Sequence, residues 1–287
     1  MCRRLLVVGR QSSQGARMKM AAFWRTLVIT LFLAFMILPV LATLGFSIAT
    51  RWDRSILPEG LTLEWWQVVV ERRAFLLTLR NSFIISLATA ASLTLLVTPS
   101  TYWAHLHVPG SKVVFEIMSV FAFGVPGVVL ALSLIRFYSN IPIPLINTPN
   151  ILVAASMVLC FPFMYRPVAN ALESIDARVL SEAAQSLGAN WWTTLIRVIV
   201  PNIMPGILGG CLLVFSTVFS EFTLTNLLVG SRFKTFPLYL VEFTRFDGRQ
   251  ASALALISFV VAWIASLLII WIAGKSGKPT ENLVGGR

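Results

Sequence analysis

The sequence predicts an all-α integral membrane protein with about six transmembrane helices. Hydrophobic residues make up 57% of the 287 residues and charged residues only 12%, whereas soluble domains carry about 25% charged residues. Apolar segments long enough to cross a bilayer, which takes about 20 residues per helix, recur along the whole chain. A soluble chain could not bury so much apolar surface in one core, but lipid tails solvate it. The composition therefore favours a single membrane domain.

Six apolar segments are expected to form the spans, and they contain one arginine, Arg166, and one carboxylate, Glu221. The segments are 26–50, a stretch within 81–105, 117–135, a stretch within 150–171, 203–224 and 251–274. Prolines inside them are expected to kink the helices. The candidates for such kinks are Pro126, Pro162, Pro167 and Pro205. The repeat Gly206-x-x-x-Gly210 should let a helix approach the fifth span closely, either within the chain or at a dimer seam.

The distribution of lysine and arginine favours an arrangement with both termini in the cytoplasm, because the N-terminal segment holds the densest basic cluster. We therefore divide the chain into a basic, disordered cytoplasmic segment 1–22, a transmembrane domain 23–275 and a cytoplasmic tail 276–287. Three methionines are candidate first residues: Met1, Met18 and Met20. Cytoplasmic anchoring explains the net charge of +11, so nucleic-acid binding is not expected.

The loop between the fourth and fifth spans, residues 173–201, is the most informative segment. Residues 177–187 are good helix formers, and Asp176 stands where a residue could cap their helix. Gly188 suits the left-handed position that closes a helix. A second short helix should follow, and Pro201 marks the point where the next span takes over. The loop is thus expected to form two short helices joined by a sharp turn.

Small side chains give this helix pair a surface of low relief, with Ala183 and Ala184 next to the carboxylate of Glu182. A groove on a partner can close over such a surface without steric conflict. A stiff helix can also transmit a push, which a flexible loop could not. The alternative is an ordinary amphipathic linker, and these physical arguments leave both interpretations open.

The same loop resembles the signature of permeases from binding-protein-dependent, type I ABC importers. That signature reads Glu-Ala-Ala, a short spacer, Gly, a longer spacer and then Ile-x-Leu-Pro. The matching residues here are Glu182, Ala183, Ala184, Gly188 and Pro201. Val200 departs from the pattern, since the family often has leucine there. The resemblance covers essentially residues 20–275.

The resemblance implies an inner-membrane permease whose Glu182-Ala183-Ala184 helix, closed by Gly188, docks in a groove of an ATP-binding subunit. It also implies a dimer of ATP-binding subunits, a second permease that is identical or paralogous, and a periplasmic solute-binding protein. ATP and magnesium would belong to the partner, so this chain is expected to hold no cofactor and to be no enzyme. Residues 274–276 resemble the end of a phosphate loop, but its first glycine is missing.

Polar residues near the end of the fifth span form a candidate translocation path: Ser220, Glu221 and Asn226. A charge in mid-bilayer costs about 2.5–3.5 kcal/mol on insertion scales, so it usually faces a cavity or another subunit. The alternative places Glu221 at a helix end near the outer surface, paired with an arginine. No metal site is expected, because His105 and His107 are too close in sequence to share one helix face.

A second resemblance concerns the solute. Residues 221–230, followed by 235–238, resemble the branch of these permeases that handles polyamines, ferric iron, thiamine or aminoethylphosphonate, although Phe236 stands where leucine is more usual. This likeness does not choose among those solutes. A membrane-embedded enzyme and a non-transporting assembly protein are the alternative functions. An enzyme would need convergent nucleophiles, bases or metal ligands within the bilayer, and the three cysteines are scattered.

Overall fold

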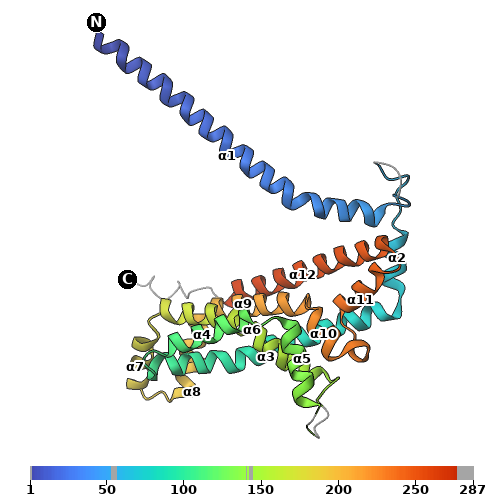
Figure 1. Cartoon of the computed structure of the whole chain (residues 1–287). Helices are drawn as coiled ribbons and strands as arrows, with labels where there is room; N and C mark the ends of the chain where they lie inside the picture. The colour runs from blue at the N-terminus through green and yellow to red at the C-terminus, as the bar shows by residue number, and fades with distance from the viewer. Residues whose placement is uncertain (1, 53–56, 140, 142–144, 277–287) are drawn as a thin grey trace.

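The computed structural model, drawn in Figure 1, describes residues 2–52, 57–139, 141 and 145–276. Over those residues the chain is helical, with one isolated β-bridge between Ala49 and Leu61 and no strand. The predicted all-α class is therefore confirmed.

Five helical stretches in the described part of the chain are long and apolar enough to span a membrane. They are α1 (Cys2–Ile48), α3 (Arg73–His107), α6 (Pro149–Ser174), the continuous stretch Trp191–Phe219 and α12 (Gly248–Ser276). The stretch Trp191–Phe219 comprises α8 (Trp191–Thr193), a π-helical turn (Thr194–Ile199) and α9 (Val200–Phe219). These stretches coincide with the first, second, fourth, fifth and sixth predicted segments, which are confirmed as helical except that the fifth ends at Phe219 and not at residue 224.

The third predicted segment, 117–135, is not one helix but two. Helices α4 (Ser111–Gly124) and α5 (Gly127–Tyr138) meet at an angle of 94°. Pro126 explains the break, because proline lacks an N–H and disfavours helical backbone in the residue before it. Val125 accordingly has φ −90° and ψ 113°, and Pro126 has ψ 137°. The expected kink is thus a complete break, and the pair makes a sixth span only when both halves are counted together.

Helix α1 extends away from the bundle, and its C-terminal part lies nearest to α12 (Figure 1). Between Phe23 and Leu44 most of its large apolar side chains are exposed. An exposed apolar helix of this length suits lipid or another subunit. The helix begins at Cys2, inside the segment 1–22 for which disorder is predicted. That segment contains no proline and several good helix formers, so nothing in it stops the helix.

Helices α3, α6 and α9 form the centre of the bundle. The glycine repeat of α9 lies against α6. A Cβ atom at Gly206 would lie 2.6 Å from the Cβ of Ala171 and 2.7 Å from the carbonyl oxygen of Pro167. A Cβ atom at Gly210 would lie 2.8 Å from the sulfur of Met164. The repeat therefore serves a contact within the chain.

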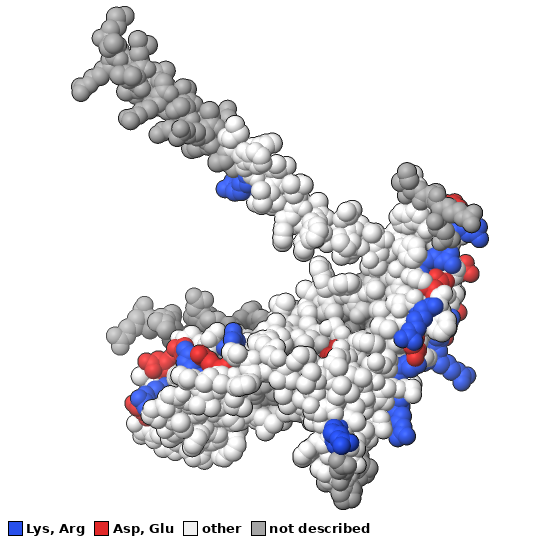
Figure 2. Space-filling view, in the orientation of Figure 1, with Lys and Arg blue, Asp and Glu red and all other residues white. Residues whose placement is uncertain are grey.

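Short helices gather at one end of the bundle: α2 (Glu64–Glu71), α10 (Thr223–Leu228), a 3-10 turn (Gly230–Phe233) and α11 (Phe236–Thr244). Phe236 anchors α11, because its ring lies 5.8 Å from that of Phe75 and its N–H donates to Ser82 Oγ at 2.8 Å. Figure 2 shows charged side chains gathered mainly at the two ends of the bundle. The largely uncharged surface between these ends is what a bilayer requires.

Candidate functional site

The loop 173–201 forms a short helix, α7 (Ala177–Ser186), at the end of the bundle away from α2 and α11 (Figure 1). Gly188 closes this helix with φ +85°, and its N–H donates to the carbonyl of Gln185 at 2.9 Å. A Cβ atom at Gly188 would meet nothing within 4 Å, so the glycine is needed for its backbone conformation and not for space. The conformation predicted for Gly188 is confirmed.

Asp176 precedes α7 but does not cap it. Its backbone is left-handed, with φ +47°, and its side chain makes no capping hydrogen bond. A capping residue normally has extended backbone, which brings its side chain to the N–H groups of the first turn. The left-handed backbone prevents this, so the capping role predicted for Asp176 is wrong.

The exposed side of α7 carries an apolar ridge, which consists of Val179, Ala183 and Leu187 at a spacing of four residues. This spacing places the three side chains along one face of a helix. Val179 is 57% exposed and Leu187 is 90% exposed, and the exposed carboxylate of Glu182 lies next to Ala183 in the chain. Ala184 is half-buried on the other side. The two larger members of the ridge were not among the predicted docking residues, although their spacing of four residues from Ala183 places them on the same helix face.

The second half of the loop leads directly into α9. The side-chain oxygen of Asn190 accepts a 2.8 Å hydrogen bond from the N–H of Thr193 and so caps α8. The π-helical turn then ends at Ile199, two residues before Pro201. A proline in a regular α-helix clashes with the carbonyl four residues earlier, which here is that of Arg197. The wider π turn relieves this clash, so the helix continues through Pro201 where a break could have formed.

Glu221 lies beyond the end of the fifth span and not within it, because α9 ends at Phe219. Its carboxylate turns back onto the chain and accepts hydrogen bonds from the backbone N–H groups that begin α10. The donors are Thr223 at 3.0 Å, Leu224 at 2.7 Å and Thr225 at 3.4 Å. The predicted placement of Glu221 inside the helix is therefore wrong, since its side chain starts a new helix. No ion pair joins Glu221 to a basic side chain among the described residues.

Ser220 and Asn226 are both exposed; Ser220 lies in the same break as Glu221, and Asn226 lies in the first turn of α10. The Ser220 hydroxyl donates to the carbonyl of Ser216 at 2.9 Å. This break adjoins the one between α4 and α5, since a Cβ atom at Gly127 would lie 4.0 Å from Leu224 Cδ2. The structure thus brings the three predicted path residues together, next to a second helix break.

Within the described residues, no group of three His, Cys, Asp or Glu side chains is placed to hold a metal ion. His107 stacks on Trp103 with ring centroids 5.5 Å apart. Cys160 and Cys211 are free thiols. The groups that bear functional chemistry are therefore the α7 surface and the break around Glu221.

Long apolar helices with charged ends, a short exposed helix at one end and two adjoining helix breaks characterise a multi-pass membrane transport subunit. The chain belongs to the family described as "Binding-protein-dependent transport system inner membrane component", whose model matches residues 100–278. It is the permease subunit of a type I ABC importer and a multi-pass protein of the bacterial inner membrane. The transport class therefore prevails over the enzyme and assembly alternatives.

Relatives give the same class. The chain is 28% identical over 262 residues to the spermidine/putrescine transport system permease protein PotB of Escherichia coli (strain K12), covering 84% of this chain and 93% of that protein. It is 32% identical over 131 residues to the molybdenum transport system permease protein ModB of Haemophilus influenzae (strain ATCC 51907 / DSM 11121 / KW20 / Rd), covering 44% and 57%.

Solved structures share the fold. One chain in the crystal structure of a bacterial ABC transporter involved in the import of the acidic polysaccharide alginate matches with a TM-score of 0.68 at 17% identity, covering 91% of this chain and 97% of that one. A second match comes from the crystal structure of a bacterial alginate ABC transporter in complex with an alginate pentasaccharide-bound periplasmic protein. Its TM-score is 0.63 at 16% identity, and the match covers 88% of this chain and 92% of that one.

Proposed function

We propose that this permease subunit moves a polyamine into the cell and that α7 receives the driving movement from a separate ATP-binding subunit. The observation that carries the coupling is the apolar ridge of α7, with Leu187 90% exposed at the charged end of the bundle. A large apolar side chain gains about 1.5–3 kcal/mol when a partner covers it. Glu182 beside the ridge supplies a charge that can fix the register of the partner.

The ATP-binding subunits work as a dimer in this proposal, and they hold the ATP and the magnesium. Each binds one α7, from this chain and from a second permease that is identical or paralogous. Closure of the dimer on ATP draws the two α7 helices together. The α7 end then lies on the cytoplasmic side with both termini, and the end with α2 and α11 faces the periplasmic solute-binding protein.

A polyamine is the favoured solute for two reasons. PotB, named for spermidine and putrescine, is similar to this chain over 84% of its length, whereas ModB, named for molybdenum, is similar over 44%. The carboxylate of Glu221 also lies in the break between α9 and α10 without an ion pair to any described basic side chain. Backbone N–H groups solvate this carboxylate but do not neutralise it, so its negative charge attracts a cation. Exposed Ser220 and Asn226 add polar groups nearby in the chain.

The test is coexpression with candidate ATP-binding, permease and binding-protein subunits, followed by reconstitution into liposomes. Spermidine and putrescine should enter, and the binding protein should stimulate ATP hydrolysis. Glu182→Lys should release the ATP-binding subunit while the permease stays in the membrane. Glu64→Lys is the matched control, because it reverses the charge of another exposed glutamate, on α2 at the other end. Normal uptake with Glu182→Lys would refute the docking role.

A further inference from the structure

Behind the apolar ridge, a buried hydrogen bond ties α7 to α3. The hydroxyl oxygen of Tyr102 in α3 lies 2.8 Å from Ser181 Oγ in α7. Tyr102 is 0% exposed and Ser181 is 1% exposed. Ser181 Oγ also donates to the carbonyl of Ala177 at 2.5 Å. Because a serine hydroxyl has a single proton, the Tyr102 hydroxyl is the donor in the bond to Ser181.

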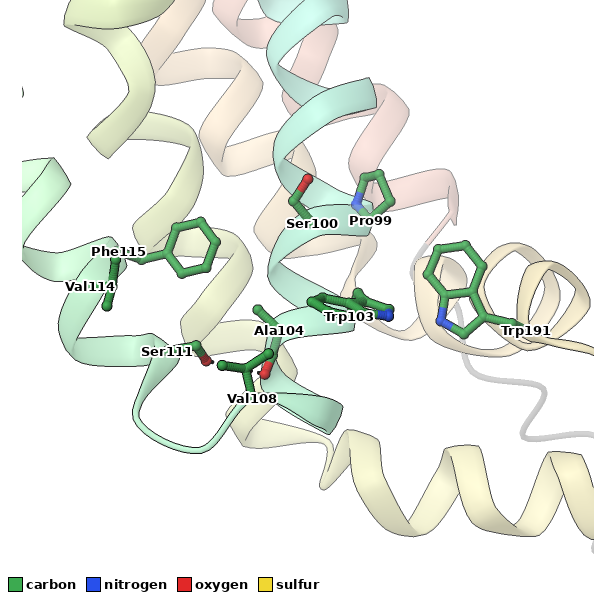
Figure 3. A pocket seen from close by; sticks show the side chains of 9 residues that line it. All are labelled: Pro99, Ser100, Trp103, Ala104, Val108, Ser111, Val114, Phe115 and Trp191. Carbon is green, nitrogen blue, oxygen red and sulfur yellow. Dashed lines mark hydrogen bonds between the residues drawn. The ribbon is translucent and has the colours of Figure 1, made fainter.

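The ring of Tyr102 also contacts the second arm of the loop. Its centroid lies 5.8 Å from that of Trp191, the first residue of α8. Trp191 in turn lines an apolar pocket of about 560 Å³ together with Trp103 of α3 (Figure 3). Tyr102 therefore joins α3 to both short helices of the loop, through its hydroxyl to α7 and through its ring to α8.

In the part of the chain that the structure describes, two other polar contacts join the loop to its neighbours, and both lie at the surface. Arg178 donates to the carbonyl of Leu106 at 3.3 Å, and Lys112 pairs with Glu173 at 2.8 Å. Exposed ion pairs contribute little because water screens them. A buried hydrogen bond is different, since its loss leaves a polar group without a partner away from water. Among the described residues, the Tyr102–Ser181 bond is therefore the buried polar contact that holds α7 to α3.

The position of Ser181 connects this tie to the docking surface. Ser181 precedes Glu182 in the chain, and α7 presents Ser181 and Ala177 inward while the ridge faces outward. A force on the ridge therefore acts directly on the helix that Tyr102 holds. Resting on the coupling function proposed above, we propose that Tyr102 is a positioning residue. Its bond to Ser181 makes α7 and the adjoining end of α3 move as one body when the ATP-binding subunit pushes.

The experiment measures the distance between α7 and α3 in the assembled transporter by pulsed electron paramagnetic resonance. Spin labels are placed at His105→Cys in α3 and Gln185→Cys in α7, since both positions are exposed and lie off the ridge. The three native cysteines are first replaced by alanine. Spectra are recorded without nucleotide and after trapping with ATP and vanadate. One-body movement predicts the same distance distribution in both states.

Tyr102→Phe removes the hydroxyl and keeps the ring, and Ser181→Ala removes the acceptor. Each should raise the population of separated α7–α3 conformers about fivefold, the effect of one neutral buried hydrogen bond. The double variant should be no worse than either single variant, because both remove the same bond. Tyr138→Phe is the matched control: it removes a tyrosine hydroxyl from half-buried Tyr138 in α5.

A distance that changes on trapping in the unsubstituted protein would overturn the proposal, as would wild-type behaviour of Tyr102→Phe. Failure of both Tyr102→Phe and Ser181→Ala to assemble would also overturn it, since the bond would then serve folding alone. Failure of the proposed coupling function would give a different experimental result from failure of the Tyr102 proposal. The ATP-binding subunit would not bind α7 at all, while the nucleotide-free spectra would still report whether the hydroxyl holds α7 to α3.

Discussion

The Glu221 carboxylate and the backbone N–H of Leu224 form a 2.7 Å hydrogen bond, and this contact begins α10 where α9 has ended. A side chain that resembles a mid-membrane charge in the sequence therefore has a backbone role as well. The helix dipole favours a negative charge at this position. The two roles, helix start and cation attraction, can be separated by substitution.

Glu221→Gln should impair transport more than assembly, because an amide keeps an acceptor oxygen for the backbone N–H groups but removes the charge. Glu221→Ala should also destabilise the protein by about 0.5–2 kcal/mol, the usual cost of losing a capping side chain. Spermidine uptake kinetics and thermal unfolding of the purified complex measure the two effects. Unaltered uptake by Glu221→Gln would remove Glu221 from the path.

Leu187→Asp should weaken binding of the ATP-binding subunit by roughly tenfold to a hundredfold, the equivalent of losing about 1.5–3 kcal/mol of apolar burial. The cause is a charge placed on the ridge that the partner covers. Gln185→Asp adds the same charge at an exposed position two residues from both Ala183 and Leu187, which places it off the ridge. Copurification and a binding titration compare the two. Equal effects of both variants would show that the ridge has no special part in docking.

Gly206→Ala should destabilise the protein by about 1–3 kcal/mol, the typical result of overpacking. A Cβ atom there would come within 2.7 Å of the Pro167 carbonyl oxygen, which is backbone and moves only with its helix. Gly209→Ala is the control in the same helix, because a Cβ atom at Gly209 would meet nothing within 4 Å. That variant should be neutral or mildly stabilising. Thermal unfolding in detergent distinguishes them, and equal melting temperatures would contradict the close approach.

Asp247, just before α12, gives a prediction about pH. Burial opposes its ionisation, but hydrogen bonds from Arg249 and Gln250 outweigh burial and hold the pKa of this carboxyl below its ordinary value. A folded-state pKa below the unfolded one adds stability above the unfolded pKa, about 3.9, and this stability is lost as the pH falls through the folded value. Asp247→Asn should therefore be less stable than wild type at pH 7, and the difference should shrink as the pH falls below about 3.9. A pH series of melting temperatures checks this, and a constant difference would contradict it.

Most of the fold follows from the sequence, because apolar length alone identifies a span. The two helix breaks, between α4 and α5 and between α9 and α10, are harder to predict from the sequence. Pro126 predicts a disturbance, yet the 94° angle depends on what α5 packs against, including α10. The predicted fifth span extends to residue 224, beyond the end of α9 at Phe219, because Phe222 and Leu224 continue the apolar run. Only the structure shows that Glu221 bonds the backbone of the next helix.

In the loop 173–201, too, some features could be predicted from the sequence and others could not. Gly188 was predictable because left-handed backbone at a helix end favours glycine. The backbone conformation of Asp176 could not be predicted, because aspartate suits both a capping role and the left-handed backbone that this residue adopts. Tyr102 and Ser181 are far apart in the sequence, so no local sequence pattern predicts their contact.

The tight seam between α6 and α9 limits how the transporter can change shape. With Gly206 and Gly210 seated against Ala171 and Met164, neither helix can slide lengthwise past the other without first lifting apart. We therefore expect α6 and α9 to move together. A change of shape in this subunit is therefore expected at its helix breaks, such as the 94° bend at Pro126, and not along the seam between α6 and α9.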